Sequence, residues 1–347
     1  MNKLFWNITF CTRVLKAKLL KTYAPFQVQF SVTDRCNLQC SYCYANYPAR
    51  GYRELDMKNI LRIIDQLAEL GTMRINLVGG EPLLRDDIGE IIDYIKDKKI
   101  ECAMTSNGYL VPKKMRDVKK LDLLCVSLDG DKKANDANRG NGSYDAAMKA
   151  IVLAKEKHIP VQVAAVITKN NLHSIGYILE EGKKYGFMVG FATLINVLDG
   201  NIKRACKDIP TDNEYKEALA EILRLKKEGY PVLFSRKSLE YSMQWPYSYS
   251  KDKVKDEAPQ FKHIRCNAGK YFAIIDTNGD LYPCPSLIGV INPINAVELG
   301  VRKAFSDIEN HGCKTCHIPC QNEFNLIYSL DPEVLCNAFL NYRHMRE

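Results

Sequence analysis

The sequence predicts an α/β fold, namely a partial (β/α)6 barrel followed by a small, cysteine-rich C-terminal α+β domain. Three observations lead to this prediction. Short apolar runs alternate with helical segments from residue 27 onward, a pattern typical of parallel sheets with crossover helices. The runs are apolar throughout, as in strands that are buried on both faces. A cluster of polar or reactive residues follows each run.

The elements are expected in a regular order. A basic, amphipathic helix occupies residues 1–26, and the barrel core follows at 27–200. Residues 201–265 are more polar and form a helical and loop segment that leads to the C-terminal domain at 266–347. Strands are predicted at 27–33, 73–80, 100–106, 122–130, 161–167 and 187–195, and helices at 56–70, 87–98, 112–119, 143–157, 172–185 and 211–228.

The polar clusters share one position relative to the strands. Three cysteines follow the first strand, and GGEP at 79–82 follows the second. The carboxyl ends of parallel strands meet at one rim, where ligands of such folds bind. The sequence therefore predicts a ligand site at this rim. The other strands end in SNG at 106–108, SLDG at 127–130, TKNN at 168–171 and Asn196.

The cysteines of CNLQCSYC are Cys36, Cys40 and Cys43. A disulfide framework favours an even number of thiols in a secreted chain, and a structural zinc site needs four ligands. Three thiolates can bind three irons of a 4Fe–4S cluster and leave the fourth iron open for a chelating amino-acid group, such as that of S-adenosylmethionine. A zinc knuckle completed by a distant histidine is the alternative.

The C-x3-C-x2-C spacing, with an aromatic residue before the third cysteine, and the GGEP motif together resemble the radical SAM superfamily over residues 27–200. The resemblance implies a 4Fe–4S cluster on the three cysteines and bound S-adenosylmethionine. It places the methionine ammonium at the GGEP backbone and Glu81, and the adenine near Tyr42. The implied cofactor-binding residues are Tyr42, Gly79, Gly80, Glu81, Pro82, Asn107, Ser127, and Asp129 or Arg139.

A second cysteine group lies in the C-terminal region. The stretch from Cys266 to Cys284, with Asn278-Gly279 as a hairpin turn, resembles the SPASM and twitch domains that carry auxiliary clusters. We expect one auxiliary 4Fe–4S cluster on Cys266, Cys284, Cys313 and Cys316. A zinc ribbon is the alternative. Cys320 and Cys336 could replace one of the four ligands or bind a second, incomplete site.

These features predict an enzyme that cleaves S-adenosylmethionine to a 5′-deoxyadenosyl radical and abstracts hydrogen from a substrate. The sequence leaves the substrate open between a small molecule, a lipid or isoprenoid, and a peptide, and it identifies no catalytic residue. A reductant such as flavodoxin or ferredoxin is the expected partner. The non-enzymatic alternative is an iron–sulfur or zinc protein that senses redox state or binds a partner.

Composition and charge indicate where the protein is located and which partners are not favoured. No run of 18 apolar residues predicts a membrane span, and the N-terminus lacks a signal-peptide pattern, so a cytoplasmic location is expected. The net charge of +8 is dispersed among acids, which does not favour nucleic-acid binding.

In the N-terminal segment, by contrast, the basic residues are not balanced by acids. It contains Lys3, Arg13, Lys16, Lys18 and Lys21 and no acid before residue 27. An apolar stripe runs beside these cations at helical spacing. We expect the stripe to pack on the main domain, and docking at a membrane surface is the alternative. The stripe consists of Leu4, Ile8, Cys11, Leu15 and Leu19.

Overall fold

The computed structural model describes residues 3–43, 45, 47–194, 208–308 and 312–345. Within these residues, a nine-stranded sheet has the order β10-β9-β8-β1-β2-β3-β4-β5-β6. Strands β1 to β6 are parallel neighbours in chain order, which confirms the predicted barrel core. They are β1 (Gln27–Ser31), β2 (Arg74–Val78), β3 (Glu101–Ser106), β4 (Leu123–Ser127), β5 (Val161–Val166) and β6 (Met188–Ala192).

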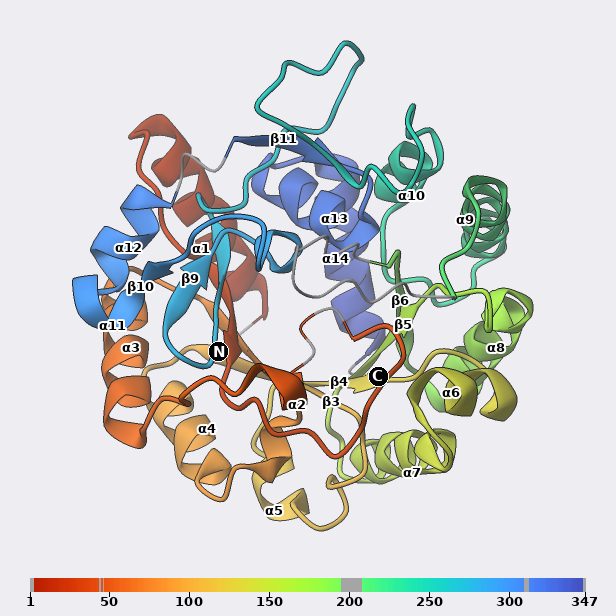
Figure 1. Cartoon of the computed structure of the whole chain (residues 1–347), viewed down its shortest axis with the longest axis horizontal. Helices are drawn as coiled ribbons and strands as arrows, with labels where there is room; N and C mark the ends of the chain where they lie inside the picture. The colour runs from red at the N-terminus through yellow and green to blue at the C-terminus, as the bar shows by residue number, and fades with distance from the viewer. Residues whose placement is uncertain (1–2, 44, 46, 195–207, 309–311, 346–347) are drawn as a thin grey trace.

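Helices surround the outside of this curved sheet (Figure 1). Helix α3 (Met57–Glu69) illustrates why they form: Asp56 caps its N-terminus, and its buried residues recur at spacings of three and four. The predicted helices of the core are therefore confirmed, with the first and last residues shifted slightly. The others are α4 (Ile88–Asp97), α5 (Met115–Val118), α7 (Ser143–Glu156), α8 (Ile175–Tyr185) and α9 (Asp212–Lys227).

Several of the observed helices were not predicted, and two of them lie in polar stretches before the C-terminal segment. Helix α6 (Lys132–Arg139) follows β4, and helix α10 (Arg236–Met243) lies in a stretch that its serines, tyrosines and lysines suggested was a loop. Both are polar, so hydrophobic periodicity does not reveal them. Their N-caps are the available signal, since the Asp131 and Ser235 side chains accept from the backbone N–H groups three residues later.

The two faces of the strands differ in composition. Outward side chains such as Phe30 and Leu77 belong to the main hydrophobic core under the helices. Inward side chains such as Gln29 and Asn76 line the interior of the barrel. The apolar runs that predicted the strands therefore describe the outer face, while the inner face carries amides and hydroxyls.

The C-terminal segment extends the same sheet. Strand β8 (Phe272–Ile275) pairs in parallel with β1, and β9 (Asp280–Tyr282) returns antiparallel to β8. Helices α13 and α14 lie across the hollow side of the barrel (Figure 1). The remaining elements are α2 (Tyr47–Arg50), β7 (Lys253–Lys255), β10 (Ile294–Asn295), α11 (Ala296–Leu299), α12 (Val301–Asp307), β11 (Cys313–Cys316), α13 (Pro319–Tyr328) and α14 (Pro332–His344).

The N-terminal helix α1 (Lys3–Leu19) forms as expected, but a different face of it packs on the protein. Phe10 and Val14 are buried, whereas Ile8, Leu15 and Leu19 of the predicted stripe are exposed. The expectation that the stripe packs on the main domain is therefore wrong for these three residues. No helix in the described part of the chain is long and apolar enough to span a bilayer.

Candidate functional site

The loop after β1 carries Cys36, Cys40 and Cys43, all of them half-buried. Burial is the largest cause that raises the pKa of Cys36 to about 11, and Glu81 and the nearby Cys40 and Cys43 thiols contribute to this rise. The backbone N–H of Cys43 donates to the carbonyl of Cys40 at 3.2 Å. The three cysteines are thus neighbours in the loop that follows β1, at the carboxyl end of the sheet.

The GGEP loop holds the start of this cysteine loop by backbone hydrogen bonds. The N–H groups of Gly80 and Glu81 donate to the carbonyls of Thr33 and Arg35, each at 2.8 Å. A Cβ atom on Gly80 would lie 2.2 Å from the Arg35 carbonyl oxygen, and one on Gly79 would lie 2.5 Å from that of Thr33. The two glycines are therefore required by close approach of the two backbones.

Glu81 is fully buried and joins the GGEP loop to the loop after β3. One carboxylate oxygen accepts from the Ser106 hydroxyl at 3.0 Å, and the other accepts from the Asn107 N–H at 2.8 Å. Burial raises the pKa of Glu81 to about 7 despite these bonds. Its contacts in this structure are with neighbouring loops, and its predicted contact with the methionine ammonium stays a prediction.

Asp129 organises the opposite part of the rim. Its carboxylate pairs with the Arg139 guanidinium through two bonds of 2.9 Å, and it accepts from the Tyr42 hydroxyl at 2.6 Å. The backbone N–H of Val166 donates to it at 3.0 Å. The sequence predicted these residues as separate cofactor contacts, whereas the structure joins three of them into one buried network.

Two more predicted residues lie on the same rim. The Asn107 side-chain amide donates to the Asn37 side chain of the cysteine loop at 2.8 Å. Ser127 ends β4 and lies beside Ala164 of β5. The strand ends therefore bring the cysteine loop and the GGEP motif to one rim, together with Asn107, Ser127, Asp129 and Arg139.

A cluster on these three thiols stays a prediction. No group of three or more His, Cys, Asp or Glu side chains among the described residues is arranged to hold one metal ion. In a 4Fe–4S cluster each thiolate binds a different iron, so its ligands stand farther apart than those of one ion.

A second thiol group forms beside the β8–β9 hairpin. A hydrogen bond with Cys266, followed by burial, raises the pKa of Cys313. Burial is the first cause that raises the pKa of Cys284 to about 12 and that of Cys316 well above its usual value, and Cys313 contributes to both. The structure thus brings together the four cysteines expected to hold the auxiliary cluster.

Cys320 and Cys336 lie apart from this group. Cys320 lines the barrel cavity, and burial raises its pKa to about 11 without a contribution from another cysteine. Cys336 is exposed in a groove beside Lys226 and Tyr230. The structure does not bring these two thiols to the other four.

A buried ion-pair network near the cysteine loop was missed by sequence reasoning. Arg50 donates to Asp34 at 2.7 Å and to both oxygens of Asp276, at 2.6 and 2.8 Å. The Thr277 hydroxyl also donates to Asp34, at 2.8 Å. Asp34 precedes the cysteines and Asp276 follows β8, so the network ties the cysteine loop to the C-terminal hairpin. The charged residues of VTDRC and IIDTNG were the available signal.

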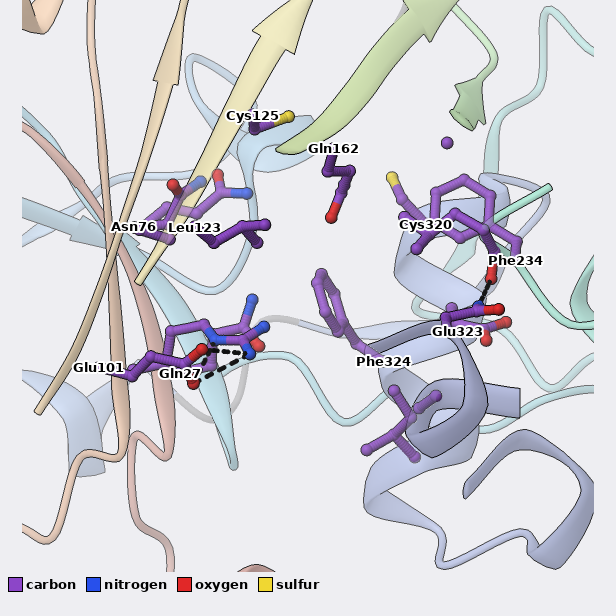
Figure 2. Close-up of a pocket in the computed structure, with 18 of the residues that line it drawn as sticks. Gln27, Asn76, Glu101, Leu123, Cys125, Gln162, Phe234, Cys320, Glu323 and Phe324 are labelled. Carbon is purple, nitrogen blue, oxygen red and sulfur yellow. Dashed lines mark hydrogen bonds and ion pairs between the residues drawn. The ribbon is translucent and has the colours of Figure 1, made fainter. Parts of the chain in front are cut away.

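The barrel encloses a cavity of about 350 Å³. Figure 2 shows side chains of the strands, including Asn76, Leu123 and Gln162, opposite Cys320 and Phe324 of α13. The lining is mostly apolar on the helical side and carries amides on the strand side. It has the size and composition of a small ligand pocket.

Comparisons with known proteins agree with this site. A family model described as radical SAM superfamily matches residues 30–182. The uncharacterized protein MJ0907 of Methanocaldococcus jannaschii is 30% identical over 286 residues, which cover 77% of this chain and 89% of that protein. An AdoMet-dependent heme synthase of Nitratidesulfovibrio vulgaris is 26% identical over 272 residues, which cover 74% of this chain and 72% of that protein.

Among solved structures, SuiB of Streptococcus suis bound to its precursor peptide SuiA has the same fold. It superposes with a TM-score of 0.66 and 19% identity, over 90% of this chain and 72% of that chain. The chain belongs to the radical SAM superfamily, whose enzymes use a 4Fe–4S cluster and S-adenosylmethionine.

Proposed function

We propose that this chain modifies a peptide by radical chemistry started at the cysteine loop, on a substrate group that enters the barrel cavity. The position of the cavity carries the proposal. It extends from Glu101 at the start of β3 to Thr105 near its end. The next residue, Ser106, bonds to Glu81 of the GGEP loop. A substrate side chain that lies along the cavity would therefore reach the rim where the cofactor is expected.

The rim residues position the cofactors in this proposal. The bound cluster and S-adenosylmethionine supply the 5′-deoxyadenosyl radical that abstracts hydrogen. Cys36, Cys40 and Cys43 bind three irons, and the GGEP backbone receives the methionine end. Glu81 is a positioning residue, because its oxygens already accept bonds from the loop after β3.

The Asp129 network holds the adenine side of the proposed site. Asp129 fixes both Arg139 and the Tyr42 hydroxyl, so it orients the tyrosine ring between the second and third cysteines. Asn107 and Ser127 remain at the rim as the proposed ribose contacts. The Asp129 and Arg139 side chains act through Tyr42, because each is occupied by the other.

The auxiliary cluster is assigned to Cys266, Cys284, Cys313 and Cys316. The support is the mutual proximity of these four thiols, of which Cys284 and Cys316 are buried and Cys266 and Cys313 are half-buried. The assigned cluster would lie beside β8, which pairs with the strand that leads to the cysteine loop. It would assist substrate binding or exchange electrons with the substrate radical.

The lining of the cavity supports an amide-bearing substrate. The side-chain oxygens of Asn76 and Gln321 are buried and accept no hydrogen bond from the described residues. A buried acceptor without a donor costs about 1–3 kcal/mol, which a ligand N–H group would recover when the side chain turns its oxygen toward the cavity. Backbone amides of a peptide present such donors. SuiB, which has the same fold, is itself bound to a peptide.

A tetrapyrrole substrate, which the heme synthase relative suggests, fits less well. Its carboxylates would need cations, and Arg74 is the one guanidinium among the described residues of the cavity lining. Arg74 already pairs with both oxygens of Glu101, at 2.9 and 3.0 Å. The cavity therefore offers amides and little free positive charge.

The first test is anaerobic and uses the reconstituted full chain. Reduction by dithionite, or by the proposed flavodoxin or ferredoxin partner, should release 5′-deoxyadenosine from S-adenosylmethionine. The release should disappear when Cys36, Cys40 and Cys43 are all replaced by alanine. An unchanged rate in that triple variant would contradict the assignment of the catalytic cluster.

Iron analysis tests the auxiliary assignment separately. The protein should hold roughly eight iron atoms per chain, and about four after Cys284→Ser with Cys313→Ser. Cys320→Ser and Cys336→Ser are the matched controls, and each should keep all of the iron. Loss of about four irons from either control would overturn the choice of ligands.

The substrate class is tested by the rate of 5′-deoxyadenosine formation. A mixed-sequence peptide pool should raise that rate, and Asn76→Leu or Gln321→Leu should reduce the rise without changing the substrate-free rate. Gln244→Leu, an exposed substitution outside the cavity, is the control. Stimulation by iron-coproporphyrin III and not by peptides would overturn the peptide proposal and leave the cluster assignment intact.

A further inference from the structure

Helix α1 presents two apolar faces. Phe10, Val14 and Ala17 are spaced four and three residues apart, and they are 7%, 0% and 5% exposed. Ile8, Leu15 and Leu19 are spaced seven and four residues apart, and they are 56%, 48% and 73% exposed. At 3.6 residues per turn these two sets lie on opposite sides of the helix. The second set therefore faces away from the protein.

The inner face of α1, with Phe10, Val14 and Ala17, packs against the rest of the protein. The outer face, with Ile8, Leu15 and Leu19, is therefore exposed although the helix is already docked on the protein. The Phe10 ring lies 5.8 Å from the Tyr328 ring of α13, between centroids. Arg13 donates to the carbonyl of Gly71 at 3.3 Å. Phe10 and Tyr328 also belong to a hydrophobic cluster with Phe26 and Phe272.

Exposed apolar side chains concentrate at this helix. Of the large hydrophobic residues exposed in the described part of the chain, Ile8, Leu15, Leu19, Leu20 and Tyr23 fall within one short segment. The others are dispersed over distant elements. Isolated exposed hydrophobic residues are ordinary, but a contiguous patch indicates an interaction surface. The dispersed residues are Tyr52, Tyr177, Val290, Leu299 and Leu340.

The charge around the patch is uniformly positive along the segment. Lys16 and Lys18 flank the exposed stripe, Lys21 follows it, and residues 1–26 contain no acid. None of the ion pairs found among the described residues involves these three lysines. Arg265 lies close enough to Lys18 to add to its positive surroundings. Such long cationic side chains can extend to lipid headgroups while apolar neighbours insert.

We propose that the outer face of α1 docks the protein on an anionic lipid bilayer. The exposed stripe would enter the boundary between headgroups and acyl chains, and the flanking lysines would contact the lipid phosphates. A protein partner fits less well, because lysine is depleted from the core of protein interfaces. Phe10 also lines the barrel cavity, so docking would hold one end of the cavity close to the membrane.

Vesicle co-sedimentation of the full reconstituted chain tests the proposal. The protein should bind vesicles of phosphatidylglycerol and phosphatidylcholine, bind pure phosphatidylcholine far more weakly, and dissociate progressively at high salt. Leu15→Ser with Leu19→Ser should lower the affinity at least about tenfold, because two leucines no longer insert. Lys16→Glu and Lys18→Glu should each lower it roughly fivefold or more.

Matched variants separate this face from general surface effects. Leu299→Ser and Lys133→Glu change exposed residues on other helices and should leave vesicle binding unchanged. Substrate-free 5′-deoxyadenosine formation should be the same in all variants, which verifies that each is folded. Absence of binding to the anionic vesicles, or equal binding by the double leucine variant, would overturn the proposal. So would a dimer in sedimentation velocity that the leucine substitutions dissociate, since the face would then join two copies.

Discussion

At the scale of single residues, the rim is built from groups whose positions are fixed by close contacts and hydrogen bonds. Gly80 touches the backbone of the cysteine loop, and the Asp129 carboxylate receives hydrogen bonds from a tyrosine, an arginine and the backbone of β5. These contacts fix where the cysteine loop begins and where the Tyr42 hydroxyl lies. Substitutions here should therefore act on the geometry of the loop as much as on stability.

Gly80→Ala should displace the cysteine loop. The added methyl would lie 2.2 Å from the Arg35 carbonyl oxygen, and backbone cannot move aside as cheaply as a side chain. We expect a loss of about 2 kcal/mol in the free energy of unfolding, measured by chemical denaturation, together with lower iron content. Gly176→Ala is the matched control, because nothing lies within 4 Å of its Cβ position. Equal stability of the two variants would show that the close approach is unimportant.

Asp129→Asn should leave the buried Arg139 charge without compensation. Removing one partner of a buried ion pair costs about 3–5 kcal/mol in the free energy of unfolding. Asp145→Asn breaks an exposed pair with Lys132 and should cost at most about 1 kcal/mol. Urea denaturation of both variants measures the difference. Comparable losses would mean that the Asp129 pair is as well solvated as the surface pair.

Most residues of the rim could be predicted from the sequence, but the hydrogen bonds and ion pairs between them could not. The cysteine spacing and GGEP are local patterns, and the strand ends bring them to one side. The Arg50 contact with Asp276 joins residues 226 positions apart, and no local pattern encodes such a distance. The cysteine spacing also could not show that Cys320 lines the barrel cavity while Cys313 and Cys316 lie with the other thiols, because this depends on where α13 packs.

At the scale of elements, the hairpin of β8 and β9 is attached to the core twice. Its backbone pairs with β1, and its Asp276 binds Arg50 of α2. The strand pairing was hidden from sequence reasoning, because FAII is too short to identify its partner strand. The polar helices α6 and α10 were hidden for a related reason, since each depends on its cap and neighbours more than on its own periodicity.

Arg50→Met should loosen the hairpin and the cysteine loop together. The variant leaves two buried carboxylates, Asp34 and Asp276, without their shared cation, which favours local opening. Hydrogen exchange should become faster in residues 272–282 and in the loop before α2. Arg224→Met, which removes exposed pairs within α9, is the control. Faster exchange confined to one of the two segments would contradict coupling between them.

At the scale of the whole molecule, a half-buried lysine links stability to pH. Burial lowers the pKa of Lys226 from 10.5 to about 8. Between these values the unfolded chain keeps a proton that the folded chain has lost, so unfolding takes up a proton and stability rises with pH. Below about pH 8 both states are protonated, and the penalty for burying the charge is fully present.

Lys226→Met should remove this dependence. Relative to the variant, the unmodified protein should gain stability as the pH rises from about 8 to 10, as measured by urea denaturation at several pH values. The ammonium also donates to the Val232 carbonyl at 2.8 Å, so the variant is compared by its slope and not by its absolute stability. Parallel curves for the two proteins would show that Lys226 titrates in the same way when folded and unfolded.

The parallel pairing of β8 with β1 has a consequence for attempts to divide the chain. It makes β1 an interior strand, although β1 is the first strand of the barrel. Cutting the chain before Cys266 would expose the hydrogen-bonding edge of β1, and free edges of this kind pair with other chains and aggregate. The auxiliary segment is therefore not an exchangeable module. A graft from a relative would have to supply a strand in the register that places Gln27 beside Phe272.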